Sequence, residues 1–294
     1  MGCHHQPCIC KMYNCHTQPL SRFLKYSVSA MLSLLLCTEV IQAQTDFAPG
    51  QIMFTGYDSD DADAFSFVIL TDVLDGTIIY ITDRGWSSTT GFRDDTDGGE
   101  GTISFEFTAD YPCGTSFVFQ DIGPSPTFWV ATDAYGVGTG IITVLVNTTE
   151  SSNQDINGIE FNSVFGTDGD QLFIYQLPEP NPGDQSGFVT AIHMNNASWQ
   201  GGNGDDYSSQ KPSGLNENQL VRFTGDPDNV KYDCSPNLGT SSVLQAAITN
   251  DNGMGGLIAD GSNNWQESNN YIALQPACKF CCGTTPPAAA PVIS

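Results

Sequence analysis

Basic residues are scarce in this sequence. It contains 9 lysines and arginines against 33 aspartates and glutamates, which gives a formal net charge of −24. Phosphate recognition by proteins depends on Lys and Arg side chains, so this balance excludes nucleic-acid binding and attraction to anionic membranes. An acidic surface instead suits a solvated extracellular protein, and it attracts cations.

Histidine is almost absent as well. Of the 4 histidines, three precede residue 43, and His193 is the single one in the rest of the chain. A zinc or iron centre built from several imidazoles is therefore excluded after residue 43. A Ser-His-Asp or Cys-His arrangement would have to use His193, whose alternating run "GFVTAIHMN" is more typical of a strand residue. Acid–base chemistry by two carboxylates remains open.

Long apolar runs are also missing, apart from "YSVSAMLSLLLC" near the start. This segment is shorter than the ~20 residues that a membrane-spanning helix needs. Basic residues precede it and the small-residue stretch "IQAQ" follows it, an order typical of a secretory signal cleaved near Ala43. Lipid attachment at Cys37 is a second reading, but Leu36 stands where a small residue is expected. Without residues 1–43 the chain carries 6 basic and 32 acidic residues, a formal charge of −26.

What the chain does contain is a series of short runs rich in Ile, Val, Phe, Tyr and Thr, separated by Gly, Asp, Asn and Pro. The clearest runs are "QIMFTGY", "AFSFVILT", "GTIIYIT", "GTISFEFT", "GTSFVFQD", "GIITVLVN", "DQLFIYQL" and "GFVTAIHM". Such residues favour strands, and their spacing of about ten residues is typical of a sandwich or barrel. The sequence predicts an all-β, mostly antiparallel β-sandwich that forms a single domain over residues 44–276.

One short helix is predicted near residues 241–250, in "TSSVLQAAITNDNG". Ser242 and Gln245 fit a capping box, and the residues from Asn250 to Gly253 supply an end signal. The helix is expected to pack four apolar side chains on the sheet, namely Val243, Leu244, Ala247 and Ile248.

Five cysteines follow the leader: Cys113, Cys234, Cys278, Cys281 and Cys282. Export makes disulfides the default state, and the odd number leaves one thiol free or paired outside this chain. Cys113 and Cys234 are expected to pair within the C-terminal "CKFCC" cluster and so to tie the end of the chain to its body. The pairing itself stays open. Residues 277–294 are predicted to be a Cys-containing, Pro- and Ala-rich linker tail, with further domains after residue 294.

Acidic clusters make calcium the cofactor to consider, because Ca²⁺ prefers oxygen ligands. The candidate ligands are Asp58, Asp60, Asp61 and Asp63 in the first cluster, and Asp94, Asp95, Asp97 and Glu100 in the second. The first cluster does not match an EF-hand loop, since Ala62 and Asp63 occupy positions that require an acid and a glycine. The alternative for each cluster is a solvated turn, and the first would then be a hairpin turn between "QIMFTGY" and "AFSFVILT".

Two tryptophans are candidates for binding a sugar. Trp86 follows the turn-like "TDRG" and Trp199 precedes "QGGNGDD", so both could lie exposed beside an acidic loop. The alternative is that both rings are buried and pack the sandwich, which is the commoner role of large aromatic residues.

The order of motifs resembles a known module. "PGQIMFTGYDSDDADAFSFVILTDVLDGTIIYITDRGW", "GEGTISFEF", "DGDQLFIYQ" and "SGLNENQLVRF" with "DNVKYDC" and "LQAAITN" follow one another over about residues 49–267. This order resembles an uncharacterised N-terminal module of bacterial secreted and cell-surface proteins, which often carry repeat, calcium-binding or sorting domains downstream. The rhythm of "GTIIYITDRGW", "GTISFEF" and "GDQLFIYQ" is also distantly similar to the lamin-tail domain. That resemblance implies an immunoglobulin-like β-sandwich used as a non-enzymatic interaction module.

The sequence therefore predicts a secreted or cell-surface, non-enzymatic module for adhesion, ligand binding or display, with an extracellular protein or a glycan as partner. One alternative is a calcium-dependent carbohydrate-binding module. Another is a carboxylate-dependent hydrolase, which would need Asp168 and Asp170 to face Asp94 or Asp97 across a cleft.

Overall fold

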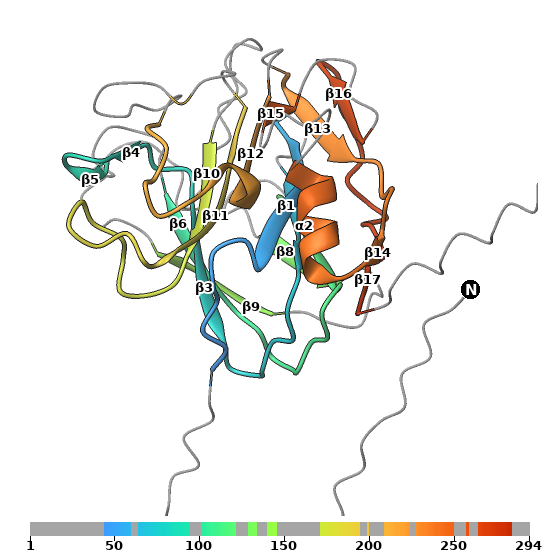
Figure 1. Cartoon of the computed structure of the whole chain (residues 1–294), viewed down its shortest axis with the longest axis horizontal. Helices are drawn as coiled ribbons and strands as arrows, with labels where there is room; N and C mark the ends of the chain where they lie inside the picture. The colour runs from blue at the N-terminus through green and yellow to red at the C-terminus, as the bar shows by residue number, and fades with distance from the viewer. Residues whose placement is uncertain are drawn as a thin grey trace, which may run out of the picture. The chain divides into compact units, whose positions relative to one another are not determined.

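Two β-sheets form the body of the protein (Figure 1). The computed structural model describes residues 44–59, 64–93, 101–121, 129–133, 140–145, 171–194, 199, 209–223, 227–249, 257–258 and 264–283. Contacts place all of these in one compact unit, Gln44–Ser294.

The first sheet has six strands and the second has seven. The six-stranded sheet has the order β16 (Trp265–Ser268), β13 (Asn229–Tyr232), β1 (Ile52–Asp58), β2 (Ala64–Ile69), β7 (Ser116–Asp121) and β8 (Trp129–Asp133). The seven-stranded sheet has the order β15 (Leu257–Ile258), β12 (Leu220–Phe223), β11 (Phe188–His193), β10 (Gln171–Tyr175), β3 (Ile78–Thr82), β6 (Thr102–Glu106) and β9 (Ile141–Leu145). Two small pairs join β4 (Trp86–Ser87) to β5 (Gly91–Phe92) and β14 (Leu238–Gly239) to β17 (Cys281–Cys282).

Most neighbouring strands are antiparallel. Within the two large sheets, the parallel pairs are β11 with β12 and β12 with β15. The pairing confirms the predicted all-β, mostly antiparallel sandwich, while its immunoglobulin-like topology stays a prediction. Strands β1 and β2 form the predicted hairpin, in which Asp58 lies opposite Ala64.

Phenylalanine rings fill the space between the sheets. Phe65 of β2 stacks on Phe119 of β7 with 4.6 Å between ring centroids. Phe105 of β6, in the other sheet, meets Phe119 edge-on at 5.1 Å. Side chains alternate between the faces of a strand, so the "SFVF" of β7 directs two phenylalanines into this core. Each buried ring contributes about 1.5–3 kcal/mol of hydrophobic free energy.

The segment of residues 271–283, here called the C-terminal strap, covers the outer face of the six-stranded sheet. Leu274 of the strap packs on Ala64 and Val118. The sequence provides room for the strap, since a Cβ on Gly56 would lie 2.7 Å from the Leu274 side chain. A Cβ on Gly114, which has a φ of +94°, would lie 2.4 Å from the Phe280 carbonyl oxygen.

Two disulfides fasten the C-terminal strap to the body. Cys113 pairs with Cys282, and Cys234 pairs with Cys278. The prediction of disulfides between the body and the C-terminal cluster is thereby confirmed. Cys278 and Phe280 are buried in the main core. The packed domain therefore continues to Gly283, beyond the predicted boundary at residue 276.

The predicted short helix is α2 (Ser241–Thr249), which lies next to β1 (Figure 1). Its first turn is held by Thr240 rather than by Ser242, because the Val243 amide donates to Thr240 Oγ1 over 3.4 Å. Leu244 and Ile248 are buried as predicted. Val243 is 43% exposed, which corrects the expectation that it packs on the sheet.

A second apolar cluster covers the outer face of the seven-stranded sheet; it is called the aromatic cluster below. The β4–β5 hairpin folds over this face and places Trp86 edge-on against Phe188 at 4.8 Å. The buried members of the cluster are Trp86, Phe92, Phe173, Tyr175, Phe188, Ala191, Leu215 and Leu220. Strands β10 and β11 are consequently buried on both faces.

Candidate functional site

The segment of residues 44–48, here called the N-terminal strap, lies against the end of the seven-stranded sheet. The side chain of Gln176, which follows β10, holds it in place. Gln176 Nε2 donates to the Thr45 carbonyl oxygen at 2.9 Å and to the Ile78 carbonyl oxygen at 3.2 Å. Gln176 Oε1 accepts from the Phe47 amide at 2.7 Å. One side chain thus connects the N-terminal strap, β3 and the end of β10.

Further contacts fix the N-terminal strap at both of its ends. The Thr45 amide donates to Thr77 Oγ1 at 2.9 Å, and Gln44 Nε2 donates to the Gly76 carbonyl oxygen at 2.7 Å. Phe47 is buried and lies 6.3 Å from Phe107, measured between ring centroids. The strap is therefore a positioned part of the domain.

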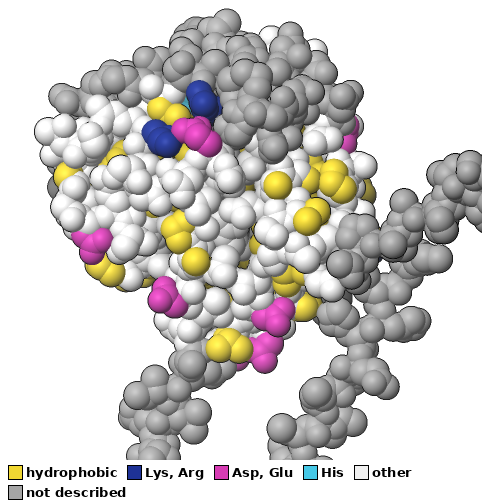
Figure 2. Space-filling model, viewed as in Figure 1, with side chains coloured by type: hydrophobic (Ala, Val, Ile, Leu, Met, Phe, Trp, Pro, Cys, Tyr) yellow, Lys and Arg dark blue, Asp and Glu magenta, His cyan; other side chains and the backbone are white. Residues whose placement is uncertain are grey.

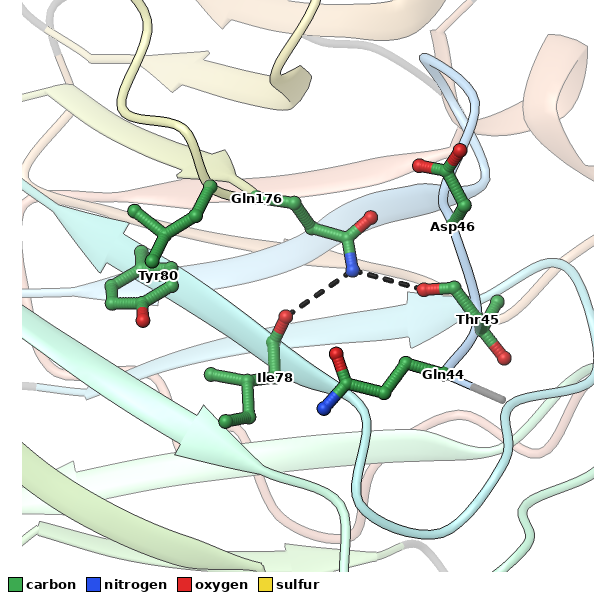
Figure 3. A pocket seen from close by; sticks show the side chains of 7 residues that line it. Gln44, Thr45, Asp46, Ile78, Tyr80 and Gln176 are labelled. Carbon is green, nitrogen blue, oxygen red and sulfur yellow. Dashed lines mark hydrogen bonds between the residues drawn. The ribbon is translucent and has the colours of Figure 1, made fainter. Parts of the chain in front are cut away.

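A hollow of about 240 Å³ lies between the N-terminal strap and β3 (Figure 3). It is lined by Gln44, Thr45, Asp46, Ile78, Tyr80, Gln176 and Leu177. The alternation of β3 explains one wall, since Ile79 and Ile81 are buried in the core while Ile78 and Tyr80 are half-buried on the other face. Leu177 is 61% exposed at the rim.

Tyr80 is held from behind by the aromatic cluster. Its ring stacks on Tyr175 with 5.3 Å between centroids and 19° between planes. Burial raises the pKa of the Tyr175 phenol, and the nearby Glu179 carboxylate raises it further. Tyr175 therefore stays protonated and donates to Glu179 Oε2 at 3.2 Å, while Arg84 forms an ion pair with the same oxygen at 3.3 Å.

Some polar groups around the hollow form hydrogen bonds within the protein, and others are available to a ligand. Gln176 uses both of its amide ends within the protein. Asp46 is exposed, and among the described residues nothing hydrogen-bonds its carboxylate or the hydroxyl of Tyr80. The carboxylate, the phenol and the carbonyl end of the Gln44 amide can therefore meet a ligand against an apolar wall.

Most of the predicted metal ligands fall on residues that are not described, namely Asp60, Asp61, Asp63, Asp94, Asp95, Asp97 and Glu100. The same holds for Asp168 and Asp170. Asp58 is fully buried, and its Oδ2 accepts a hydrogen bond from the Ile272 amide at 3.0 Å. It thus anchors the C-terminal strap. Among the described residues, no group of three or more His, Cys, Asp or Glu side chains could hold a metal ion.

The two candidate tryptophans are packing residues in this structure. Trp86 has no exposed surface, which does not agree with an exposed platform for sugars. Trp199 is half-buried and lies 4.8 Å from His193 and 6.1 Å from Phe173, measured between ring centroids. His193 is fully buried in β11, which agrees with the prediction that it is a strand residue.

The residues around the hollow were not predicted from the sequence. Phe47 and Gln176 meet across 129 residues, and neither belongs to a motif. The sequence held one local sign of this role of Gln176. It is a polar residue directly after the buried "QLFIY" of β10, where its amide can form hydrogen bonds with several backbone groups.

Comparison with protein-family models, curated proteins and solved structures finds no match for this chain. Nor does any helix among the described residues have the length and apolar character needed to cross a membrane.

Proposed function

We propose that this chain is a secreted or cell-surface β-sandwich module that binds an extracellular ligand without converting it, in adhesion or display. The observation that carries the proposal is the hollow beside the N-terminal strap, which offers open polar groups against an aromatic wall. The hollow combines polar and apolar lining residues, and ligand sites likewise place a few polar groups beside an apolar wall.

The disulfides support the extracellular location. Disulfides persist in oxidising compartments and are rare in the cytosol. Cys113–Cys282 and Cys234–Cys278 both fasten the C-terminal strap, and Cys278 lies in the main core, so the fold is built around these bonds. The predicted leader of residues 1–43 agrees with this location.

The composition of the hollow supports binding without conversion. Hydrolysis by acid–base chemistry usually needs two carboxyl groups on either side of the reacting bond. Among the described residues that line the hollow, Asp46 is the single acid, and none of them is His, Cys or Lys. These described side chains can hold a ligand but lack the pair of carboxyl groups that such hydrolysis uses.

The surface of the described residues also suits a solvated module. On the face shown in Figure 2, exposed hydrophobic side chains lie scattered, and two basic side chains lie beside an acidic one near the top. The large hydrophobic residues with the greatest exposure are Leu74, Ile141, Leu177, Val243 and Tyr271. Scattered apolar residues of this kind are normal on a soluble protein.

The test is to present the labelled full chain to arrays of glycans and extracellular proteins, with added calcium and with EDTA. We expect retention on a defined set of ligands and no change in the mass of the bound ligand after prolonged incubation. Loss of all binding in EDTA would favour the calcium-dependent alternative. Cleavage of a bound ligand, or no retention in either condition, would overturn the proposal.

A further inference from the structure

We infer that the hollow between the N-terminal strap and β3 accepts one neutral sugar unit of a glycan. This inference rests on the proposed binding function and names the ligand class for the same site. It concerns a place formed by Tyr80 and Asp46, and neither tryptophan that the sequence singled out is among its described lining residues.

The size of the hollow limits the ligand. Its volume of about 240 Å³ lies below the ~300–1,000 Å³ of sites for drug-sized molecules. A nucleotide or an oligosaccharide does not fit within it, whereas a single hexose-sized ring does. The exposed Leu177 at the rim leaves room for the rest of a glycan to extend into solvent.

The two walls of the hollow match the two sides of a sugar ring. A pyranose has an apolar C–H face and an edge of hydroxyl groups. The Tyr80 ring, Ile78 and Leu177 provide an apolar wall, while Asp46 and Gln44 provide oxygen atoms that accept hydrogen bonds from hydroxyl groups. A ligand with both characters on opposite sides uses the whole site.

Charge selects a neutral ligand over an anionic one. None of the described residues that line the hollow is Lys or Arg, and the chain has a formal net charge of −24. In the full chain used below, a uronic acid, sulfate or phosphate group would meet the Asp46 carboxylate without a Lys or Arg side chain among the described lining residues, so such ligands are disfavoured.

A cationic amine is also a weaker match. It would form an ion pair with one exposed carboxylate, and such surface pairs contribute little free energy. It would also make little use of the apolar wall that Tyr80, Ile78 and Leu177 provide.

The site is held in place before a ligand arrives. Gln176 ties the N-terminal strap to β3, and Tyr175 fixes the plane of the Tyr80 ring. Because these side chains are already ordered, binding avoids most of the entropy cost of arranging them.

The experiment is a titration of the full chain with single sugars, followed by ligand-observed NMR and calorimetry. The probes are neutral hexoses, 6-deoxyhexoses and N-acetylhexosamines, with glucuronic acid and glucosamine as charged comparators. We expect binding of at least one neutral sugar, and weaker binding of its uronic acid and amine counterparts. Preference for either charged comparator, or no binding of any neutral sugar, would overturn the inference.

Two variants locate the site. Tyr80→Ala removes the aromatic wall, and it should weaken binding about tenfold because the apolar face of the sugar loses its partner. Asp46→Asn removes the charged acceptor, and it should weaken binding about tenfold because a hydrogen bond to a charged group is worth that much or more. Tyr271→Ala and Asp233→Asn are the matched controls, because both residues are exposed and lie outside the lining of the hollow. Both controls should bind as the unchanged chain does.

The outcomes separate this inference from the proposed function. If Tyr80→Ala and Asp46→Asn keep full affinity while the chain still binds a glycan or a protein on the arrays, the function stands and this site is wrong. If Tyr80→Ala does not fold, Asp46→Asn still decides, because the Asp46 carboxylate has no hydrogen bond to the described residues that folding would lose.

Discussion

The Cys113–Cys282 disulfide should shield most of the sandwich from mechanical extension. The bond joins residues that are 169 positions apart, and it lies one residue before the end of the C-terminal strap. When the chain is pulled through residues 44 and 283, the covalent path runs from Gln44 to Cys113 and crosses the disulfide to Cys282. The residues between the two cysteines carry no load.

The expected extension follows from chain length. About 70 residues lie between Gln44 and Cys113, and at about 3.6 Å per residue they extend to about 250 Å. The double change Cys113→Ser/Cys282→Ser releases the 169-residue loop, except for the 44 residues that Cys234–Cys278 still closes. The net gain is about 125 residues, or about 450 Å of contour length.

Single-molecule force spectroscopy on the full chain, pulled through its two ends in a Cys281→Ser background so that no bond of Cys281 contributes, measures this difference directly. Residues outside 44–283 contribute equally to both proteins and cancel. The matched control is Cys234→Ser/Cys278→Ser, which should leave the contour length unchanged because that disulfide lies inside the bypassed loop. Equal extension of the unchanged chain and of Cys113→Ser/Cys282→Ser would refute the reasoning.

Three further predictions concern the C-terminal strap, the N-terminal strap and the binding of calcium. Asp58→Ala leaves the Ile272 amide without its acceptor, and we expect a loss of about 1–3 kcal/mol of unfolding free energy in a denaturant titration. Gln176→Ala removes three hydrogen bonds, and the Phe47 amide should then exchange with deuterium about tenfold faster or more. Calcium at about 100 times its Kd should stabilise the fold by about 2.7 kcal/mol if acidic turns bind it. Thermal melting in calcium and in sodium chloride of matched ionic strength tests this, and an equal response in both salts contradicts specific binding.

Controls exist for the two substitutions. Asp233→Ala changes an exposed acid near the strap disulfides, and it should alter the unfolding free energy by less than about 0.5 kcal/mol. Gln210→Ala removes an amide that accepts from Ser88 elsewhere on the surface, so exchange at Phe47 should stay unchanged. If Asp58→Ala is no more destabilising than Asp233→Ala, the buried carboxylate does not anchor the C-terminal strap.

The strands were predictable because their side chains repeat with a period of two. In β7, Phe117 and Phe119 face the core while Val118 faces the C-terminal strap. Such alternation is a local property of the sequence, so it reports strands without knowledge of their partners. The helix was also predictable from local signals, namely a capping box and an end signal. Thr240, however, takes the capping role expected of Ser242.

The coverage of the outer faces was not predictable. "TDRGW" carries turn signals that indicated an exposed Trp86, yet the β4–β5 hairpin folds back and buries the ring against Phe188. Periodicity says which face of a strand is apolar, but it does not say which distant segment covers that face. The same limit applies to the hollow, whose wall depends on contacts between Gln176 and the N-terminal strap.

The positions of the two straps connect the mechanical prediction to the binding site. Asp46 and Tyr80 precede Cys113, so they belong to the part of the chain that bears load, whereas Gln176 and Leu177 belong to the shielded loop. A pull on Gln44 acts on the hydrogen bonds that hold residues 44 and 45 to Gly76 and Thr77, and then on those between the N-terminal strap and Gln176. Loss of these bonds would release the strap that carries Asp46 from β3, which carries Tyr80. If the hollow binds a ligand as proposed, we therefore expect tension on the N-terminal side of the domain to weaken that binding, while the Cys113–Cys282 bond shields Gln176 and Leu177.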